Sequence, residues 1–262
     1  IFAKLESFNP GGSVKDRPAL YMIERAEERG ELTRDKVILE ATSGNTGIGL
    51  ALVAAAKGYR LCLTLPESAS DERKKILKAL GAELRFTPAA LGTDGAIEEA
   101  YAIKRENPDR YFLVDQFNNE DNIAAHYHGT AVEIWEQTGG EITMFVAALG
   151  TSGTAMGCAR RLKEYNPAIR IVGVEPYMGH RIQGLKNMKE SYRPGIFDRS
   201  RLDEKVNILD EDAYEMARRL LREEGIFSGM SCGAAMHVAV EKARELSEGL
   251  IVVVLPDSAE RY

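Results

Sequence analysis

A lysine at an expected helix start carries the clearest chemical signal in this sequence. Lys15 follows a turn-forming Asn-Pro-Gly-Gly run at residues 9–12 and lies within Ser-Val-Lys-Asp-Arg at residues 13–17. A cation there would face the positive end of the helix dipole, so the neutral amine is favoured, and a neutral amine attacks aldehydes. Lys15 is therefore a candidate Schiff-base residue. The competing interpretation is a surface lysine whose aliphatic stem covers apolar neighbours.

A segment rich in glycine and hydroxyl groups follows the expected strand at residues 37–40. It reads Ala-Thr-Ser-Gly-Asn-Thr-Gly over residues 41–47 and opens a helical pattern. The first helix amides, with the hydroxyls of Thr42, Ser43 and Thr46, suit a carboxylate, and Asn45 can donate to a phenolate or carbonyl oxygen. An ordinary capped strand-to-helix turn is the alternative.

A second such segment follows the expected strand at residues 144–148. Its residues are Gly150, Thr151, Ser152, Gly153 and Thr154. Small residues let backbone amides approach an anion, and the following helix adds its dipole, so a phosphate is the natural ligand. The spacing matches neither G-x-G-x-x-G nor the G-x-x-x-x-G-K-[ST] loop, so nicotinamide dinucleotides and nucleoside triphosphates lose their main support as ligands.

A third small-residue turn, at residues 229–234, offers a hydroxyl where the other two offer anion sites. It reads Gly-Met-Ser-Cys-Gly-Ala and opens another helical pattern. Ser231 is placed to face a heteroaromatic nitrogen. The alternative, which this segment alone favours, is that Ser231 is simply a helix N-cap.

The composition limits the classes of partner. The 262 residues, 44% of them hydrophobic, suffice for one large α/β domain or two smaller lobes. A net charge of −6 with mixed signs gives no field for nucleic acid or an anionic membrane, so small-molecule ligands are favoured. The 3 cysteines, Cys62, Cys158 and Cys232, show no C-x-x-C spacing, which argues against a disulfide framework or a structural zinc site and fits the cytoplasm.

No signal-peptide pattern and no apolar run of membrane-spanning length is present, so we expect a soluble protein. The first residues read as a strand and the last follow a strand and loop. We therefore expect the sequence to be trimmed at both ends.

Strand-like runs alternate with helical patterns along the chain, which predicts parallel sheets covered by helices. The expected strands cover residues 1–5, 37–40, 60–65, 83–86, 144–148, 169–175 and 250–255. The expected helices cover residues 46–57, 71–80, 124–137, 154–164, 212–224 and 234–247. The polar stretch at residues 118–122 is the expected crossing between lobes, and residues 179–198 show no clear periodicity.

Together, the segments at residues 13–17, 42–47, 150–154 and 229–234 resemble the cysteine synthase (O-acetylserine sulfhydrylase) family of fold type II pyridoxal-phosphate enzymes. The order and the spacing match. The similarity extends along the whole chain, including Asp-Gln-Phe-Asn-Asn at residues 115–119, Pro-Gly-Ile-Phe at residues 194–197 and the terminal Pro256, Glu260, Arg261 and Tyr262.

The resemblance implies that Lys15 carries pyridoxal 5′-phosphate as an internal aldimine and is also the base that removes the substrate α-proton. It implies that Asn45 bonds the cofactor 3′-oxygen, that Gly150, Thr151, Ser152, Gly153 and Thr154 hold its phosphate, and that Ser231 meets its pyridine nitrogen. The implied ligands of the amino-acid carboxylate are Thr42, Ser43, Gly44, Thr46 and Gln116. No metal is expected.

The implied reaction is a β-replacement that passes through an aminoacrylate. O-acetylserine or O-phosphoserine loses its β-substituent, and sulfide or thiosulfate adds to give L-cysteine or S-sulfocysteine. A serine hydroxyl cannot keep the ring nitrogen protonated, so the ring is a weaker electron sink, which suits β-elimination over transamination. Residues 115–122 with 194–197 look like the B-type isozymes and residues 179–184 like the A-type, which leaves the sulfur donor open.

The implied fold is the two-lobed fold type II architecture, similar to the tryptophan synthase β chain, with a mostly parallel sheet covered by helices in each lobe. The smaller lobe is expected at residues 9–119 and the larger at 120–262, with residues 1–8 packing against the larger lobe or linking to it. The family further implies a homodimer and serine acetyltransferase as a partner.

Two other classes of function stay open. A sister activity, cystathionine β-synthase or serine/threonine dehydratase, would use the same chemistry, because homocysteine or water can capture the same intermediate. A catalytically inactive fold that binds a partner, such as a peptide tail, is the third reading; Lys15, Asn45 and the phosphate segment argue against it.

The sequence departs from the family pattern at two places. Residues 129–132 read Gly-Thr-Ala-Val where members commonly have Thr-Thr-Gly-Pro, so we expect a different local turn at a helix start. Cys232 replaces a frequent serine, and we expect it to be packed. His126 and His128 form an H-x-H pair, for which a structural role is favoured over metal binding.

Overall fold

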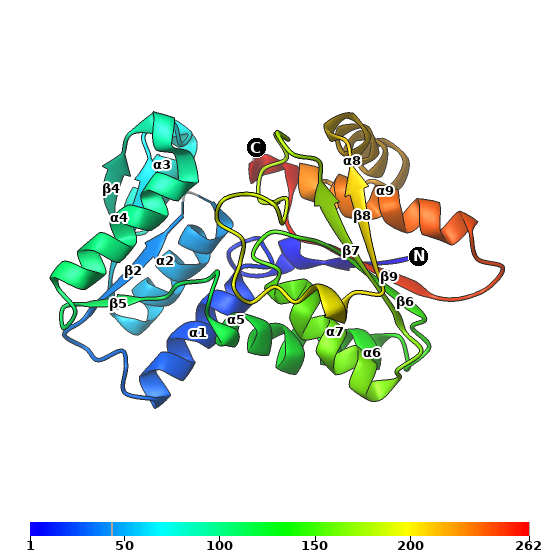
Figure 1. Cartoon of the computed structure of the whole chain (residues 1–262), viewed down its shortest axis with the longest axis horizontal. Coiled ribbons are helices and arrows are strands. Elements are labelled where there is room, and N and C mark those ends of the chain that lie inside the picture. Colours follow the sequence, from blue (N-terminus) through cyan, green and yellow to red (C-terminus); the bar gives the residue numbers. More distant parts are fainter. Residues whose placement is uncertain (43, 262) are drawn as a thin grey trace. The chain divides into compact units, whose positions relative to one another are not determined.

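Two parallel sheets, each covered by helices, organise the chain (Figure 1). The computed structural model describes residues 1–42 and 44–261. These residues divide into two compact units, residues 15–121 and residues 1–14 with 122–262. The predicted fold class of parallel sheets covered by helices is confirmed, whereas the predicted lobe boundaries, 9–119 and 120–262, stay a prediction.

The unit formed by residues 15–121 holds a four-stranded sheet in the order β4-β3-β2-β5, and every strand pair in it is parallel. Its strands are β2 (Val37–Ala41), β3 (Arg60–Pro66), β4 (Glu83–Thr87) and β5 (Tyr111–Leu113). Its helices are α1 (Asp16–Glu28), α2 (Asn45–Lys57), α3 (Asp71–Ala79) and α4 (Gly92–Glu106).

Alternation along β3 shows why this sheet needs helices on both faces. Leu61, Leu63 and Leu65 join the apolar cluster formed with α1 and α2. Thr64, which points to the opposite face, donates its hydroxyl to Ala96 O of α4 at 2.8 Å. Because both faces are buried, the strand reads as a continuous apolar run.

The second unit holds a five-stranded parallel sheet in the order β1-β9-β6-β7-β8. Its strands are β1 (Phe2–Leu5), β6 (Met144–Ala148), β7 (Arg170–Pro176), β8 (Glu204–Ile208) and β9 (Ile251–Leu255). Its helical segments are α5 (Glu120–Ala125, which begins just before the unit boundary), the π-helix η3 (His126–Thr130), α6 (Ala131–Gln137), α7 (Gly153–Tyr165), α8 (Asp210–Glu224) and α9 (Met230–Arg244).

This sheet is also buried on both faces. Met144 and Val146 of β6 lie in the cluster with α8 and α9, whereas Phe145 and Ala147 lie in the cluster with α6 and α7. Strand β1 pairs with β9 in parallel, so the first and last strands of the chain lie side by side (Figure 1).

Several elements differ from the predicted ones. α4, β5 and β8 were not predicted, because α4 opens on glycines, β5 has only 3 residues and β8 is half-buried and polar. The helix predicted at residues 124–137 is confirmed as part of one helical run over residues 120–137. Because this run passes through η3 without a break, the turn and helix start predicted near residue 129 are wrong. α9 starts at Met230, four residues before the predicted start at residue 234.

The described part of the chain contains no helix that is both long and apolar enough to cross a membrane.

Candidate active site

Lys15 occupies the position that the sequence pattern indicated. It is the N-cap residue of α1, it is half-buried, and no side-chain bond caps this helix end. Its carbonyl oxygen accepts the first helical bond, from Ala19 N at 3.0 Å. A Cβ at Gly49 of α2 would lie 3.1 Å from Lys15 O, so this glycine lets α2 pack closely on the backbone that carries Lys15.

The loop from β2 to α2 places several predicted carboxylate ligands at one helix N-terminus. Gly44 is the N-cap of α2, and its N–H donates to Thr42 Oγ1 at 3.1 Å. Asn45 and Thr46 are the first residues of the helix, where backbone N–H groups have no acceptor within the helix. Ser43, also predicted, lies outside the described residues. The segment is therefore built like an anion site.

Gln116 meets Thr46 within the same unit, although 70 residues separate them in the sequence. Thr46 Oγ1 donates to Gln116 Oε1 at 2.7 Å, and both side chains are buried. Gln116 is delivered by the turn after β5, where Asp115 adopts a left-handed φ of 53°. Tyr101 and Asn118 donate to the Asp115 carboxylate at 2.8 and 2.9 Å and so hold this turn.

Glu40 is a site residue that the sequence reasoning missed. Its carboxylate accepts from Gln116 Nε2 at 3.2 Å and from Gln116 N at 3.4 Å. It is 2% exposed and stands at the carboxyl end of β2, directly before the anion loop. Burial, and then the negative charge of Asp115, raises the pKa of Glu40 to about 8. A charged residue inside an otherwise apolar strand was the available signal.

The predicted phosphate segment has an unusual backbone. Ser152, the N-cap of α7, has a φ of 71°, a left-handed conformation that is rare for residues other than glycine. This turn directs the first amides of α7 toward the loop. Thr151 is fixed from the other side, because Asn122 Nδ2 donates to Thr151 Oγ1 at 3.0 Å.

The segment fits a bound phosphate group. A Cβ at Gly150 would lie 2.4 Å from Gly184 O, and one at Gly153 would lie 2.0 Å from Asn122 Oδ1, so neither position admits a larger residue without displacement. Ser152 Oγ is buried and has no hydrogen-bond partner among the residues that the structure describes. A buried hydroxyl without a partner is costly, and an anion at this helix start would satisfy it.

His126 was assigned a structural role from the sequence, and the structure shows which one. It is buried in η3, with Nδ1 at 2.9 Å from Thr130 Oγ1 and Nε2 at 3.2 Å from Thr154 Oγ1. The imidazole therefore links the π-helix to the phosphate segment. A Cβ at Gly157 would lie 2.4 Å from Ile123 O, so this glycine is what lets α7 pack against the helical run.

Ser231 is the second residue of α9 and is 3% exposed. The N-cap of this helix is Gly229, so the alternative that Ser231 caps it is wrong. Cys232 is packed, as expected: its Sγ donates to Asp257 O at 3.2 Å, and burial raises the pKa of its thiol. A Cβ at Gly233 would lie 2.0 Å from Ala213 O, which explains this glycine by contact between α8 and α9.

The predicted site residues fall into two groups, one in each compact unit. The first group, in residues 15–121, holds the amine, the oxygen partner and the carboxylate ligands: Lys15, Thr42, Gly44, Asn45, Thr46 and Gln116. The second group, in residues 122–262, holds the phosphate segment and the ring-nitrogen partner: Gly150, Thr151, Ser152, Gly153, Thr154 and Ser231.

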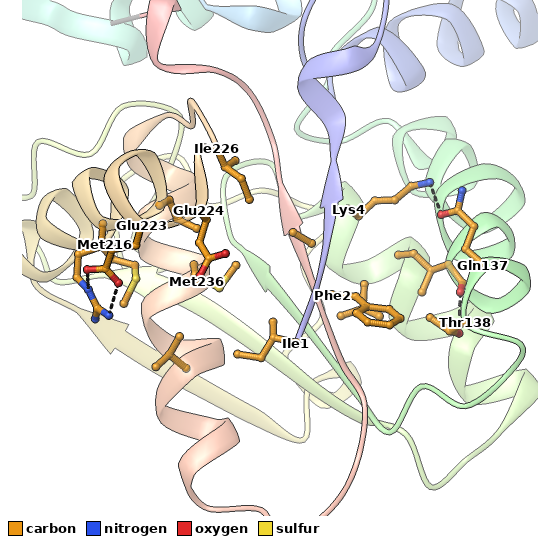
Figure 2. Close-up of a pocket in the computed structure, with 16 residues that line it drawn as sticks. Ile1, Phe2, Lys4, Gln137, Thr138, Met216, Glu223, Glu224, Ile226 and Met236 are labelled. Carbon is orange, nitrogen blue, oxygen red and sulfur yellow. Dashed lines mark hydrogen bonds and ion pairs between the residues drawn. The ribbon is translucent and has the colours of Figure 1, made fainter.

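A pocket of about 540 Å³ in the second unit contains none of these residues (Figure 2). Its wall includes Ile1 and, from β1, Phe2 and Lys4. Polar pairs border it: Lys4 donates to Gln137 at 2.9 Å on one side, and Arg219 pairs with Glu223 at 2.8 Å on the other. We assign no function to this pocket.

Comparison with known proteins agrees with these features. The family model of pyridoxal-phosphate-dependent enzymes matches residues 1–257. The chain is 51% identical to a cysteine synthase of Aquifex aeolicus, covering all of this chain and 82% of that protein. It is 48% identical to cysteine synthase B of Pseudomonas aeruginosa, covering 87% of that protein. The crystal structure of a cysteine synthase of Entamoeba histolytica superposes with a TM-score of 0.93 at 43% identity, covering 99% of this chain and 79% of that one.

Proposed function

Because the chain belongs to the pyridoxal-phosphate-dependent enzymes and, within them, to the cysteine synthase family, we propose that it makes L-cysteine from O-acetylserine and sulfide. The likeness to relatives over the whole chain supports the reaction class. One structural observation supports the cofactor site. The Ser152 hydroxyl, at the left-handed start of α7, is buried and has no hydrogen-bond partner among the described residues.

We propose that Lys15, Asn45, the phosphate segment at residues 150–154 and Ser231 are cofactor-binding residues. When bound, pyridoxal 5′-phosphate supplies an electron sink for the substrate α-carbon. The first amides of α7 with the hydroxyls of Thr151, Ser152 and Thr154 hold its phosphate. Ser231 would offer the pyridine nitrogen a hydroxyl without formal charge, so the electron sink would stay moderate.

Lys15 is the proposed catalytic residue. Its Nζ would hold the cofactor at the aldehyde and would accept the proton from the substrate α-carbon. The carboxylate of the amino acid binds at the start of α2, to Thr42, Ser43, Gly44 and Thr46, with Gln116 beside them. A carboxylate held there is placed by first-turn amides and hydroxyls, so the α-carbon is presented in one orientation.

Covalent trapping tests the cofactor assignment. Borohydride reduction of the cofactor-loaded protein should attach pyridoxyl to the peptide that contains Lys15, detectable by mass spectrometry. Lys15→Ala should lose this attachment and at least about a thousandfold in turnover of O-acetylserine with sulfide. Lys75→Ala, at an exposed lysine of α3, is the matched control and should behave like the wild type. Covalent labelling that persists in Lys15→Ala would disprove the assignment.

A side-by-side assay separates the sister activities. O-acetylserine and O-phosphoserine are each offered with sulfide, thiosulfate or homocysteine, and all products are quantified. We expect L-cysteine to predominate, with thiosulfate giving S-sulfocysteine if the chain follows its B-type relative. Pyruvate as the main product would show a dehydratase, preference for serine with homocysteine a cystathionine β-synthase, and no response to any amino acid an inactive binding fold.

We further propose a homodimer in the cytoplasm, with serine acetyltransferase as a binding partner. Family membership supports these assignments. Light scattering coupled to size exclusion measures the mass of the assembly, and titration with the carboxyl-terminal peptide of a serine acetyltransferase tests the partner. A monomeric mass would refute the homodimer, and a lack of affinity for the peptide would refute the partner.

A further inference from the structure

Glu40 is a buried carboxyl group that the proposed chemistry does not use. It is the only charged residue of β2, a strand that lies between β3 and β5 and is buried along its whole length. A carboxylate in such a place is expensive unless it is hydrogen-bonded. Among the described side chains, Gln116 is the one that donates to the Glu40 carboxylate, so the cost of burying Glu40 is coupled to the orientation of that amide.

The hydrogen bonds define the direction of the Gln116 amide. Its Nε2 donates to Glu40 Oε1 at 3.2 Å, while its Oε1 accepts the hydroxyl of Thr46 at 2.7 Å. With an ionised Glu40 the reverse orientation would place the amide oxygen against a carboxylate, which has no proton to donate. Thr46 has a single hydroxyl proton, and in this arrangement Gln116 accepts it.

We infer that Glu40 is a positioning residue that sets the orientation of the Gln116 amide and, through it, the direction in which the Thr46 hydroxyl proton points at the carboxylate site. The inference rests on the proposed function, because the ligand is the carboxylate of the amino-acid substrate. It adds a residue that does not itself touch that ligand.

Protonation of Glu40 gives the second arrangement. A proton from the buffer binds to the Glu40 carboxylate, whose O–H can then donate to Gln116 Oε1 once the amide has turned over. Gln116 Nε2 then donates to Thr46 Oγ1, which still has its own proton to offer to a ligand carboxylate. Binding of an anionic ligand is thereby coupled to the uptake of one proton, and no other group changes its charge.

The surroundings of Glu40 favour this coupling. Its pKa of about 8 arises from burial and from Asp115, which faces it from the turn after β5. Leu63 of β3 lies opposite Glu40 in the sheet, next to Cys62, whose pKa burial raises to about 11. The two helices packed on β2 carry further ionisable groups. On α2 this is Lys57, the last residue of the helix, which is paired with Glu27; on α4 these are Tyr101, bonded to Asp115, and Asp94, Glu98, Glu99, Lys104, Arg105 and Glu106.

Calorimetric titration of the cofactor-loaded protein with L-serine tests the inference without relying on turnover. Glu40→Gln imitates the protonated state, because its amide donates to Gln116 Oε1 but does not titrate. Between about pH 7 and 9 the Kd of the wild type, divided by that of Glu40→Gln, should rise about tenfold, as expected for one group with a pKa of about 8. The amine of L-serine titrates in the same way in both experiments, so its effect on the Kd cancels in this ratio.

Two further measurements keep the test decisive. Titrated in two buffers of different ionisation enthalpy at about pH 9, the wild type should take up close to one proton more per L-serine than Thr46→Val does. This comparison removes the proton changes of the ligand amine and applies even if Glu40→Gln does not fold. In Thr46→Val the Kd, divided by that of Glu40→Gln, should no longer rise with pH. A purely electrostatic effect of Glu40 would leave this rise unchanged. The inference is overturned if the Kd values of the wild type and Glu40→Gln change in parallel with pH. It is also overturned if the wild type takes up no additional proton, or if the rise of its Kd ratio with pH persists in Thr46→Val.

Failure of the proposed function looks different. In that case none of the proteins binds L-serine or O-acetylserine at any pH, although the absorbance of the bound cofactor is normal. That outcome removes the carboxylate site and the role of Glu40 together. Normal binding with parallel pH curves removes only the role of Glu40.

Discussion

At the scale of single residues, the proposed site depends on groups whose contacts could not be identified from the sequence. Lys15, Thr46 and Gln116 could be selected by type and by resemblance, but the carboxyl group that orients Gln116 could not. Glu40 stands in an apolar strand with no motif of its own. Only the turn at Asp115, with its left-handed backbone, brings Gln116 to it.

Glu40 should make folding stability depend on pH. Its pKa in the folded protein, about 8, exceeds the ordinary value of 4.5, so its contribution is complete below about pH 4.5 and is lost as the pH rises through about 8. Glu40→Gln does not titrate. The unfolding free energy of the variant relative to the wild type should therefore rise by up to about 1.4 kcal/mol per pH unit within this interval. Urea denaturation at several pH values measures it.

Glu98→Gln serves as the control, since Glu98 is exposed on α4 of the same unit. Its unfolding free energy should follow that of the wild type across the whole interval. A Glu40→Gln curve that also runs parallel to the wild type would show that the carboxyl group of Glu40 has an ordinary pKa.

Gly153 should tolerate no side chain. A Cβ there would meet Asn122 Oδ1 at 2.0 Å, so Gly153→Ala forces Asn122 or the loop to move, at a cost of about 1–3 kcal/mol. Thermal unfolding measures this cost, and fluorescence titration measures the accompanying loss of cofactor affinity. Adding Asn122→Ala to Gly153→Ala should restore part of the stability. No recovery in the double variant would place the clash elsewhere.

At the scale of elements, the helix predicted at residues 124–137 lies within the helical run from Glu120 to Gln137, and the error concerns only the interior of this run. The departure from the family pattern at residues 129–132 predicted a changed turn, but the chain continues as a helix through the π-helical segment η3. The extra residue of a π-turn shifts side chains around the axis. Here His126 of η3 contacts Thr154 of the phosphate segment.

His126→Ala should weaken cofactor binding through Thr154. Loss of one hydrogen bond to a proposed phosphate ligand corresponds to about 0.5–1.5 kcal/mol, or a rise of about 2- to 12-fold in the Kd of pyridoxal phosphate. Equilibrium dialysis or fluorescence quenching measures the Kd. His128→Ala, which changes the exposed histidine of the same pair, is the matched control and should leave the Kd unchanged. Equal effects of both variants would contradict the proposed contact.

At the scale of the whole molecule, the site residues are divided between two compact units, each with its own parallel sheet. Every strand-to-helix loop discussed lies at the carboxyl end of a strand, where parallel sheets collect their loops. The proposed amino-acid ligands belong to one unit and the proposed phosphate ligands to the other. Binding of the cofactor to the folded chain is expected to stabilise it.

The phosphate group should account for much of this stabilisation. Pyridoxal phosphate at about 100 times its Kd should add about 2.7 kcal/mol to the unfolding free energy. Pyridoxal, which lacks the phosphate, should raise the melting temperature less at the same concentration, and Ser152→Ala should narrow the difference. Differential scanning calorimetry measures these shifts. Equal shifts from both ligands would show that the segment at residues 150–154 does not hold the phosphate.

The sequence by itself determined the fold class, the main parallel strands and the loops that follow them. Alternating apolar runs and helical patterns are local properties, and residues such as Lys15 and Ser152 could be selected because glycine-rich turns before helices have a distinct local chemistry. The short strand β5 and the polar edge strand β8 escaped because their stability comes from their neighbours in the sheet rather than from their own residues.

Only the tertiary structure decided how distant groups combine. Glu40, Gln116 and Thr46 become one network, and His126 meets Thr154, because packing brings together residues from different elements. Hydrogen bonds act over about 3 Å, and no pattern along the chain records which side chains fall within that distance after folding. The steric need for Gly153 and Gly157 has the same origin, since the atoms that exclude a Cβ belong to other helices and turns.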